Sequence, residues 1–349
     1  MRPWQNMRNS WQLPGSPANP LREDSRRNPD QPNTMKHSLT AFGAFGFLSS
    51  VVLAGSTVVD TKPVATADGF AQARRPISNP TLFDLALPGT NVHPIFIYHG
   101  LPNKISTAGG GSVDLGGDVE VYALQFEIAL NDRLSIVATK DGYLDMNYDE
   151  TLEDQSGFAN LGAGLKYAFI RDDASRTALS GTMTFELPTG NSDVFQGEGD
   201  GAVNLILNGL KLIDDWQFAG SIGAQIPFSD EQSTMAFLSA HASYEVCQYF
   251  IPLVELNWFH VVDAGDGTGN FPAYLNGAVP AAVNFEGGDV FNLGAVNSTE
   301  NRDFVTAAFG FRARINDSVN VGAAYEIPLT NEEESLMEER VTIDLIWNF

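Results

Sequence analysis

Short segments in which apolar and polar residues alternate recur along the chain from about residue 92 onwards. In one of them, Tyr122, Leu124 and Phe126 alternate with Ala123 and Gln125. Successive side chains of an extended strand point to opposite faces, so each segment predicts a strand with one apolar and one polar face. The polar faces are rich in Gly, Ala, Asn, Gln and single charges, a composition typical of a barrel interior.

These segments predict an all-β protein, a transmembrane antiparallel up-and-down β-barrel of about 12 strands, and 10 or 14 strands also fit the pattern. Pro94 and Pro252 lie within two of the segments, although proline lacks the amide donor of a strand interior. The expected strands cover residues 92–99, 119–130, 133–144, 158–170, 176–187, 200–211, 215–227, 233–246, 248–260, 303–314, 318–328 and 340–349.

Connections between the strands alternate in length, which favours a membrane barrel over a soluble two-sheet sandwich. Asn and Asp mark the short connections, because their side chains can bond their own backbone in a tight turn. Outer-membrane barrels have short periplasmic turns and long external loops, and an even number of strands returns both ends to the periplasm. The expected long connections lie at about residues 100–118, 145–157, 188–199, 228–232, 261–302 and 329–339.

The last strand places Val341 and Ile343 on one face and ends in Trp347 and Phe349. A strand that ends on an aromatic residue resembles the closing strand of bacterial outer-membrane barrels. The resemblance implies that Trp347 and Phe349 belong to a barrel-closing strand that the barrel-assembly machinery recognises, and that outer-membrane lipid surrounds the protein. An aromatic belt at the lipid headgroups is also expected beside the short turns. Its members would be Tyr167, Phe169, Trp216, Phe218, Tyr244, Phe250, Trp347 and Phe349.

The chain before the barrel divides into three parts. Residues 1–34 are rich in Pro, Asn and Arg without a hydrophobic period, and we interpret them as a disordered or non-native upstream extension. Residues 35–73 have a basic start and an uncharged apolar run, which predicts a secretory signal segment; a membrane-spanning helix over 39–59 is the alternative. Residues 74–91 are expected to be a periplasmic N-terminal stretch, and residues 92–349 the barrel.

The charge of the chain is strongly acidic. Its 349 residues carry a net charge of −23 and a single cysteine, Cys247, which excludes an internal disulfide and a thiolate metal cluster. Nine Lys and Arg and five Asp and Glu precede residue 76, which leaves a net charge near −27 on the rest. Such a chain repels nucleic acid, whereas acidic external loops attract divalent cations, which we expect as partners there.

Two motifs resemble those of a known family. The sequence reads LGAGLKY at residues 161–167 and FELPTGN at residues 185–191, followed by a glycine-rich acidic loop and another amphipathic strand. These motifs resemble the transporter-like outer-membrane β-barrels labelled phenol-degradation MetA-pathway proteins, over about residues 90–349. The resemblance implies a porin-like barrel in the outer membrane of a Gram-negative bacterium that admits small, aromatic or otherwise hydrophobic molecules. It implies no catalytic residue.

Charged side chains on the predicted inward faces are the candidate site. A lone charge in a narrow lumen is costly, so opposite charges there are expected to pair. The pairs would brace the wall or line a constriction that selects permeants by charge, and both roles remain open. The lumen-lining candidates are Glu127, Lys166, Glu186, His241, Glu245, Glu255, Arg312, Arg314, Glu326 and Asp344.

The longest connection, residues 261–302, is acidic and longer than most structureless loops. It would either fold inward as a plug or stand outside as a cap. Its residues 263–270, DAGDGTGN, invite a calcium interpretation, but they lack the EF-hand spacing and its closing Glu, so a turn-rich loop is expected. The acidic residues at 332–334 and 338–339 are expected at a solvated rim.

Catalytic and cofactor motifs are weak in this chain. His241 and Ser243 share a face, and a membrane-barrel hydrolase would need such a pair with a third orienting group. Two positions along a strand are about 7 Å apart, which predicts no hydrogen bond between them. His93, His99 and His260 have no shared metal spacing, and no phosphate-binding loop is present. We therefore expect no enzyme activity, no catalytic residue, no metal site and no cofactor.

Taken together, the sequence favours an exported outer-membrane channel or transporter through which small molecules, hydrophobic or aromatic, diffuse. The acidic loops would enrich cations outside, and a lumen of mixed charge would filter the permeant. The alternative is a structural or adhesive surface barrel, whose lumen is filled by its own side chains and whose external loops carry the function.

Overall fold

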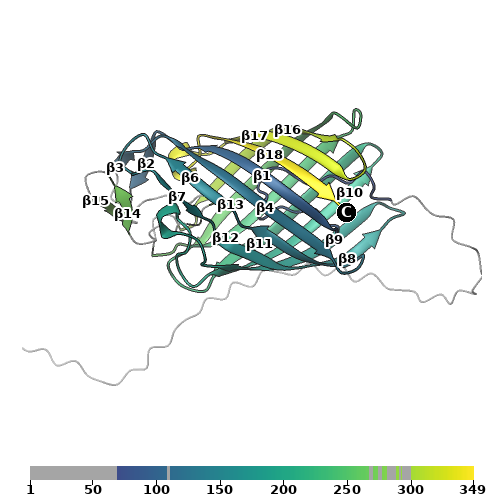
Figure 1. Cartoon of the computed structure of the whole chain (residues 1–349), viewed down its shortest axis with the longest axis horizontal. Helices are drawn as coiled ribbons and strands as arrows, with labels where there is room; N and C mark the ends of the chain where they lie inside the picture. The colour runs from purple at the N-terminus through teal and green to yellow at the C-terminus, as the bar shows by residue number, and fades with distance from the viewer. Residues whose placement is uncertain are drawn as a thin grey trace, which may run out of the picture. The chain divides into compact units, whose positions relative to one another are not determined.

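The computed structural model describes residues 69–107, 111–266, 270–273, 277–280, 288–290, 292 and 300–349. Within them the protein is almost entirely β-structure, dominated by one large antiparallel sheet (Figure 1). The sheet contains β1 (Asn91–Gly100), β4 (Asp118–Ala129), β5 (Leu134–Lys140), β6 (Tyr143–Asn147), β7 (Gln155–Phe158), β8 (Leu161–Asp172), β9 (Thr177–Leu187), β10 (Ala202–Ile213), β11 (Trp216–Pro227), β12 (Thr234–Tyr244), β13 (Ile251–Asp263), β16 (Asp303–Arg314), β17 (Val319–Pro328) and β18 (Glu339–Asn348). Residues 1–68, with the upstream extension and most of the signal segment, lie outside the described part.

The sheet closes into a barrel because β1 pairs with β18 on one side and with β4 on the other. The wall has the 12 strands that the sequence predicts, since β5 and β6 share one position beside β4 and β7 leads into β8. Two predicted strands are nevertheless interrupted, at residues 141–142 and 159–160. Gly142 has a φ of +125°, and a Cβ there would lie 2.8 Å from the Tyr122 carbonyl oxygen, so glycine lets the chain step out of strand geometry.

The two faces of the wall differ in the way the alternation predicts. Leu124 and Phe126 expose 50% and 42% of their surface, whereas Gln125 and Glu127 expose 3% and 2%. The apolar rows therefore point outward, where a soluble sandwich would bury them, and they suit hydrocarbon. The residues of the expected aromatic belt are all exposed, from 37% for Tyr244 to 73% for Phe349.

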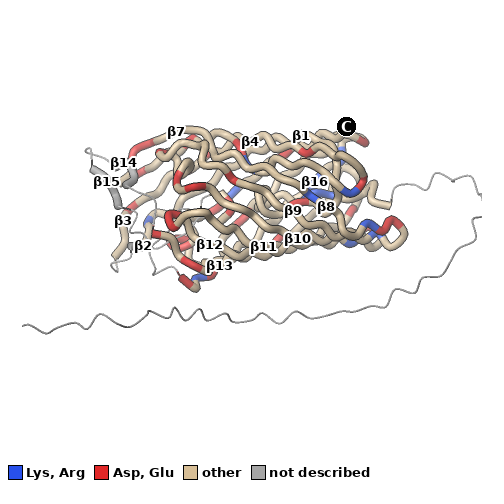
Figure 2. The backbone as a smooth tube through the Cα atoms, turned by 90° about the horizontal axis from the view of Figure 1, so that it is seen from below, with Lys and Arg blue, Asp and Glu red and all other residues tan. Residues whose placement is uncertain are grey.

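The two ends of the barrel are built differently (Figure 1). The end that we call the turn end holds the start of β1, the C-terminus and the short connections at residues 130–133, 173–176, 214–215, 245–250 and 315–318. Figure 2 shows Lys and Arg positions gathered toward this end. The opposite end, called the loop end, carries β2 (Lys104–Thr107), β3 (Gly111–Asp114), the 3-10 helix η1 (Ser192–Val194), β14 (Asn270–Ala273), β15 (Gly277–Pro280) and α1 (Glu332–Ser335).

Helix is confined to two single turns in the described residues, and neither has the length and apolar character needed to cross a bilayer. The longer one, α1, begins after Asn331, whose side chain accepts a hydrogen bond from the Glu333 amide. Three acidic residues occupy its first turn, next to the positive end of the helix dipole. The acidic run at 332–334 thus forms a capped turn at the loop end.

Apolar side chains fill much of the barrel interior near the loop end. They form a buried cluster from the wall and from the loops above it. The cluster contains Ile95, Ile97, Leu101, Ile105, Leu115, Val119, Val121, Leu144, Met146, Tyr148, Leu152, Ala159, Val194, Phe195, Val290 and Leu336. The largest apolar part of the described interior therefore lies toward the loop end.

Residues 69–90, called the lumen segment from here on, lie inside the barrel. At the turn end, the guanidinium of Arg171 lies 5.8 Å from the centre of the Phe70 ring. Farther in, the Thr81 hydroxyl donates to the Asp289 carbonyl at 3.3 Å, so the segment reaches the part of the long loop that folds into the barrel mouth.

The lumen segment then returns to the end from which it entered. The Phe349 amide donates to the Thr90 carbonyl at 3.0 Å, beside the start of β1. The structure therefore differs from the expectation of a periplasmic stretch at residues 74–91, because residues 74–90 lie in the lumen and Asn91 begins β1. The polar inward face of the wall accounts for this placement, because it offers partners to a backbone that has no strand neighbours.

Candidate functional site: the occupied lumen

Polar groups of the wall hold the lumen segment at its entry and near its deepest point. The Arg74 amide donates to Gln217 Oε1 at 2.7 Å, and Gln217 Nε2 donates back to the Arg74 carbonyl at 2.5 Å. Deeper in the barrel, Asn79 Nδ2 donates to Ser239 Oγ at 3.0 Å. All four residues are buried, so these contacts are shielded from water.

A chain of buried ion pairs joins the segment to β8 and β4. Arg75 pairs with Asp84 within the segment, and Lys166 Nζ lies 2.5 Å from Asp84 Oδ2 and 2.9 Å from Glu127 Oε2. The Gly89 amide also donates to Glu127, at 3.1 Å. Each buried charge in this chain thus has an opposite partner, which is the condition for tolerating charges away from water.

The pKa of Asp84 shows how strongly this chain of ion pairs favours the ionised carboxylate. Burial alone would raise the pKa of Asp84, but Arg75 and Lys166 hold it well below its usual range. The backbone amide of Leu85 adds to this effect, because it donates to Asp84 Oδ1 at 2.7 Å. Asp84 is therefore charged across the physiological pH range.

A second ion pair crosses the turn end between β16 and β18. Arg312 donates to both oxygens of Asp344, at 3.0 and 2.8 Å, in the bidentate geometry that favours guanidinium with carboxylate. His93 Nε2 lies 2.8 Å from the same carboxylate. This cluster braces the seam at which the first and last strands meet.

Glu245 serves two arginines at the mouth of the turn end. Its carboxylate lies 3.1 Å from Arg74 on the lumen segment and 2.5 Å from Arg314 on β16. Burial lowers the pKa of Arg74 to about 10; Glu245 opposes this shift and Arg314 adds to it. The single carboxylate of Glu245 therefore pairs with one arginine of the lumen segment and one of the wall.

Glu255 fastens the middle of the lumen segment. It accepts hydrogen bonds from the amides of Ile77 and Ser78 at 3.0 and 2.7 Å and from the Ser78 hydroxyl at 2.5 Å. His241 Nδ1 lies 2.6 Å from the same carboxylate, and His241 Nε2 lies 2.9 Å from Ser243 Oγ.

The last contact corrects the sequence analysis, which predicted no hydrogen bond between His241 and Ser243. Their side chains meet because the imidazole is long enough to bridge two positions on one face of β12. Serine, histidine and a carboxylate in this order also make up hydrolase triads. Here Ser243 exposes only 1% of its surface and the carboxylate of Glu255 holds the lumen segment, so the cluster acts as a fastening of the segment.

Two further clusters lie closer to the loop end. Arg340 lies 2.8 Å from Asp289 of the long loop and 3.5 Å from Glu326 on β17. On the other side of the barrel, Lys140 lies 2.6 Å from Glu186. The longest loop therefore folds at least partly inward, as one of its two expected arrangements required; residues 267–269 of its suggested calcium segment lie outside the described part.

All ten lumen-lining candidates have side chains on the inner side of the wall, and eight of them expose 3% or less of their surface. The remaining two, Glu245 and Arg314, are half-buried at the turn-end mouth. Among the partners of the ten candidates, the sequence analysis missed Arg74, Asp84 and Arg340. The predicted inward faces carried more carboxylates than cations, which was a signal for the two arginines but not for Asp84.

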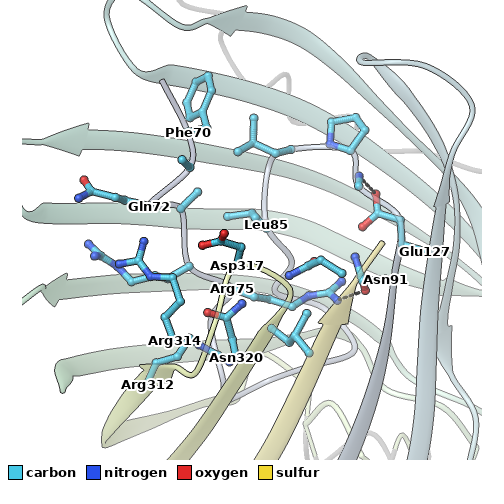
Figure 3. A pocket seen from close by; sticks show the side chains of 18 of the residues that line it. Phe70, Gln72, Arg75, Leu85, Asn91, Glu127, Arg312, Arg314, Asp317 and Asn320 are labelled. Atoms are coloured by element: carbon cyan, nitrogen blue, oxygen red, sulfur yellow. Dashed lines mark hydrogen bonds between the residues drawn. The ribbon is translucent and has the colours of Figure 1, made fainter. Parts of the chain in front are cut away.

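A vestibule of about 270 Å³ opens at the turn end, between the lumen segment and the wall (Figure 3). Arg312 and Arg314 line it from β16, and Arg75 and Leu85 line it from the segment. Toward the loop end, a much smaller cavity of about 40 Å³ is lined mainly by apolar residues such as Ile95. That volume is far below the roughly 300–1,000 Å³ of sites for drug-sized ligands.

Comparison with solved structures supports the same architecture. The chain resembles the crystal structure of an outer membrane channel from Pseudomonas putida F1, with a TM-score of 0.51 and 14% sequence identity over 75% of this chain and 96% of that one. It resembles less closely the NanC porin, with a TM-score of 0.42 and 7% identity over 73% of this chain and 100% of that one. A third neighbour is the translocator domain of the autotransporter NalP from Neisseria meningitidis, with a TM-score of 0.43 and 10% identity over 75% and 88% of the two chains.

No family model matches the sequence, and no curated protein matches it. At 14% identity, the likeness to the Pseudomonas channel establishes the fold and not the permeant. The closed wall and the outward apolar rows agree with this likeness. The chain has the closed, antiparallel fold of outer-membrane β-barrels.

Proposed function

We propose that the protein is a channel or transporter for small molecules, and that the lumen segment is the part that opens and closes it. By the rule for outer-membrane barrels, the turn end faces the periplasm and the loop end faces outside. The observation that carries the proposal is the noncovalent attachment of the segment. Hydrogen bonds and ion pairs hold it at Gln217, Glu245, Glu255 and Lys166. Its apolar residues Ile77, Leu82 and Leu87 also pack against the wall.

The apolar interior near the loop end favours permeants of a hydrophobic or aromatic kind. Such a molecule would enter a region lined by Ile95, Ile97, Val121 and Leu144, where it loses contact with water. This permeant class agrees with the family that the motifs at residues 161–167 and 185–191 resemble. Release of the lumen segment would then give it a path to the periplasm.

A reversible cross-link tests whether the segment must move. Asn79 and Ser239 are in contact at 3.0 Å, so cysteines at both positions, in a Cys247→Ser background, can be joined by a short thiol-reactive linker. We expect the cross-linked protein to show a conductance in planar bilayers at least severalfold below that of the same protein after reduction. Cysteine at position 79 alone is the control, since it takes up the reagent without tying the segment to the wall.

The alternative function is a structural or adhesive surface barrel, and one observation favours it. The interior is filled by the protein's own side chains and by the lumen segment, as that alternative requires. It predicts no conductance in either state of the cross-linked protein. It also predicts that loops at the loop end can be exchanged without any effect on the uptake of small molecules.

A further inference from the structure

The vestibule at the turn end has the features of a binding site that the channel proposal does not require. It is a cavity of about 270 Å³, slightly below the roughly 300–1,000 Å³ typical of sites for drug-sized ligands. A molecule with a single ring and one short substituent is therefore the size that it can enclose. Figure 3 shows that the lumen segment forms one side of the vestibule and the strands of the wall form the other.

The charges around the vestibule leave a local excess of cations. Apart from Arg171, whose partner Asp173 is exposed, five buried or half-buried cations face four carboxylates in this part of the interior. The cations are Arg74, Arg75, Lys166, Arg312 and Arg314, and the carboxylates are Asp84, Glu127, Glu245 and Asp344.

The excess is greatest at Glu245, which alone balances Arg74 and Arg314. Asp317 also lines the vestibule and Asp215 lies near Arg74, but both side chains are at the exposed rim, where solvent and salt screen them.

Two of the arginines that line the vestibule also carry unpartnered donors. The Nε atoms of Arg74 and Arg312 are buried and have no hydrogen-bond partner among the described residues. An unmet donor on a buried cation is costly, and an anionic oxygen is the acceptor that relieves it most. Burial and the proximity of Arg314 lower the pKa of Arg74 to about 10, although Glu245 opposes this, and the site therefore stays cationic at neutral pH.

The rest of the lining selects what the anion is attached to. Leu85 and Leu87 of the lumen segment and Ile251 and Ile346 of the wall present aliphatic surface to the same cavity. A small inorganic anion would leave this surface in contact with water, whereas a ring would cover it. Guanidinium forks match a carboxylate, which they bind with two parallel hydrogen bonds.

We propose that the turn-end vestibule binds small aromatic monocarboxylates, with the carboxylate at Arg74, Arg312 and Arg314 and the ring against Leu85 and Leu87. The inference extends the proposed function, because it names a ligand class for the periplasmic mouth of the channel. Since Arg74 belongs to the lumen segment and Arg314 to the wall, a bound carboxylate bridges the two. Ligand that binds only this arrangement stabilises it by mass action.

Equilibrium dialysis of the full-length protein in detergent against radiolabelled benzoate tests the site, with empty micelles as the blank. We expect saturable binding to one site and competition by benzamide, the neutral analogue, that is about tenfold or more weaker than competition by unlabelled benzoate. Arg314→Gln should weaken benzoate binding about tenfold or more. Arg133→Gln, at another turn of the same end and outside the vestibule, should leave it unchanged.

Asp317→Asn is expected to change the affinity in the opposite direction. Asp317 is exposed, so the substitution should leave folding intact. Removal of this rim carboxylate should tighten benzoate binding at low ionic strength, where its charge is least screened. Equal competition by benzamide and benzoate, or unchanged affinity in both Arg314→Gln and Asp317→Asn, would overturn the proposal. Phosphate that competes as well as benzoate would overturn the aromatic part and leave an inorganic-anion site. Since binding is measured without ion flow, a barrel without conductance can still bind benzoate, and a conducting one can fail to.

Discussion

Lys166 on β8 reaches across the lumen to Asp84, with its Nζ 2.5 Å from the carboxylate Oδ2. One residue belongs to the wall and the other to the segment that the wall encloses, and both are almost fully buried. The pair therefore reports directly on whether the segment is in place. It also ties the segment to a lysine that the alternation of β8 already placed on the inner face.

Neutralisation of Asp84 should loosen the lumen segment. In Asp84→Asn, Arg75 loses its carboxylate partner and Lys166 keeps only Glu127, and breaking a buried pair in this way costs about 3–5 kcal/mol. We expect amide hydrogen exchange of residues 74–86 to accelerate while the strands stay protected. Asp173→Asn is the matched control, because Asp173 is exposed in a turn and its pair with Arg171 is long, at 3.7 Å.

Acid should have the same effect on the segment as this substitution. Because Arg75 and Lys166 hold the pKa of Asp84 below its usual value of 3.8, ionisation of Asp84 stabilises the docked segment at every pH above that value. This stabilisation is lost as the pH falls below about 3.8 toward the lowered pKa. Exchange rates corrected for intrinsic pH dependence should rise over this window, and Asp84→Asn should show a flatter profile. Identical profiles would contradict the assignment.

Two substitutions in the cluster around Glu255 should have different effects on conductance. Glu255→Ala removes the acceptor of the Ile77 and Ser78 amides, so the segment should undock and the conductance of the purified barrel should rise. Ser243→Ala removes only the hydroxyl beyond His241 and should change conductance little. A serine-reactive fluorophosphonate that labels the undocked protein at Ser243 would instead point to a hydrolase.

The outward rows of the wall predict a depth-dependent cost of charge. Leu165→Arg places a charge on the lipid face of β8 near its middle, where the cost in a bilayer is about 2–4 kcal/mol. Leu161→Arg lies on the same face at the loop end of the strand and should cost about 0–1 kcal/mol. Unfolding by guanidinium in lipid vesicles measures both variants. Equal costs would show that the middle of β8 does not meet hydrocarbon.

The exposed terminal residue predicts an effect on assembly rather than on stability. Phe349 exposes 73% of its surface, so its side chain contributes little packing to the finished barrel. If the assembly machinery recognises the last strand, Phe349→Ala should reduce the heat-modifiable, folded fraction in cells while refolded protein keeps its unfolding midpoint. Phe228→Ala, at another exposed position near the loop end, is the control and should assemble normally.

The alternation of apolar and polar residues was enough to predict most of the fold. Every strand of a membrane barrel has lipid on one side and the barrel interior on the other, so the same pattern recurs in each strand. The segment predicted at residues 303–314 coincides with β16, and neighbouring strands differ by only one to three residues at their ends. The break beside Gly142 escaped this reasoning, since a local change of backbone angle leaves the alternation on both sides intact. An Asp-Gly pair at 141–142 is a turn signal that could have located it.

Only the part of the candidate site that belongs to the barrel wall could be predicted from the sequence. Alternation placed Lys166, Glu255 and Asp344 on the inner face, but it could not say what they would meet. Their partners Asp84 and Ser78 lie in a segment that has little regular structure, so no period marks them. His93, the partner of Asp344, lies on β1, whose strand was predicted, but its pairing was not. Long-range pairs of this kind depend on the path of the chain through the lumen, and that path is set by many weak contacts together.

The return of the lumen segment to its point of entry has a topological consequence. Because Phe70 and Thr90 lie at the same mouth, the intervening residues form a loop that enters and leaves the barrel on one side. Such a loop can leave a closed barrel and return to it without any chain end passing through the barrel. The wall need not unzip for this, so β1 and β18 can stay joined throughout. The lumen segment can therefore move out only at the turn end. The loop end must be opened by movement of its own loops.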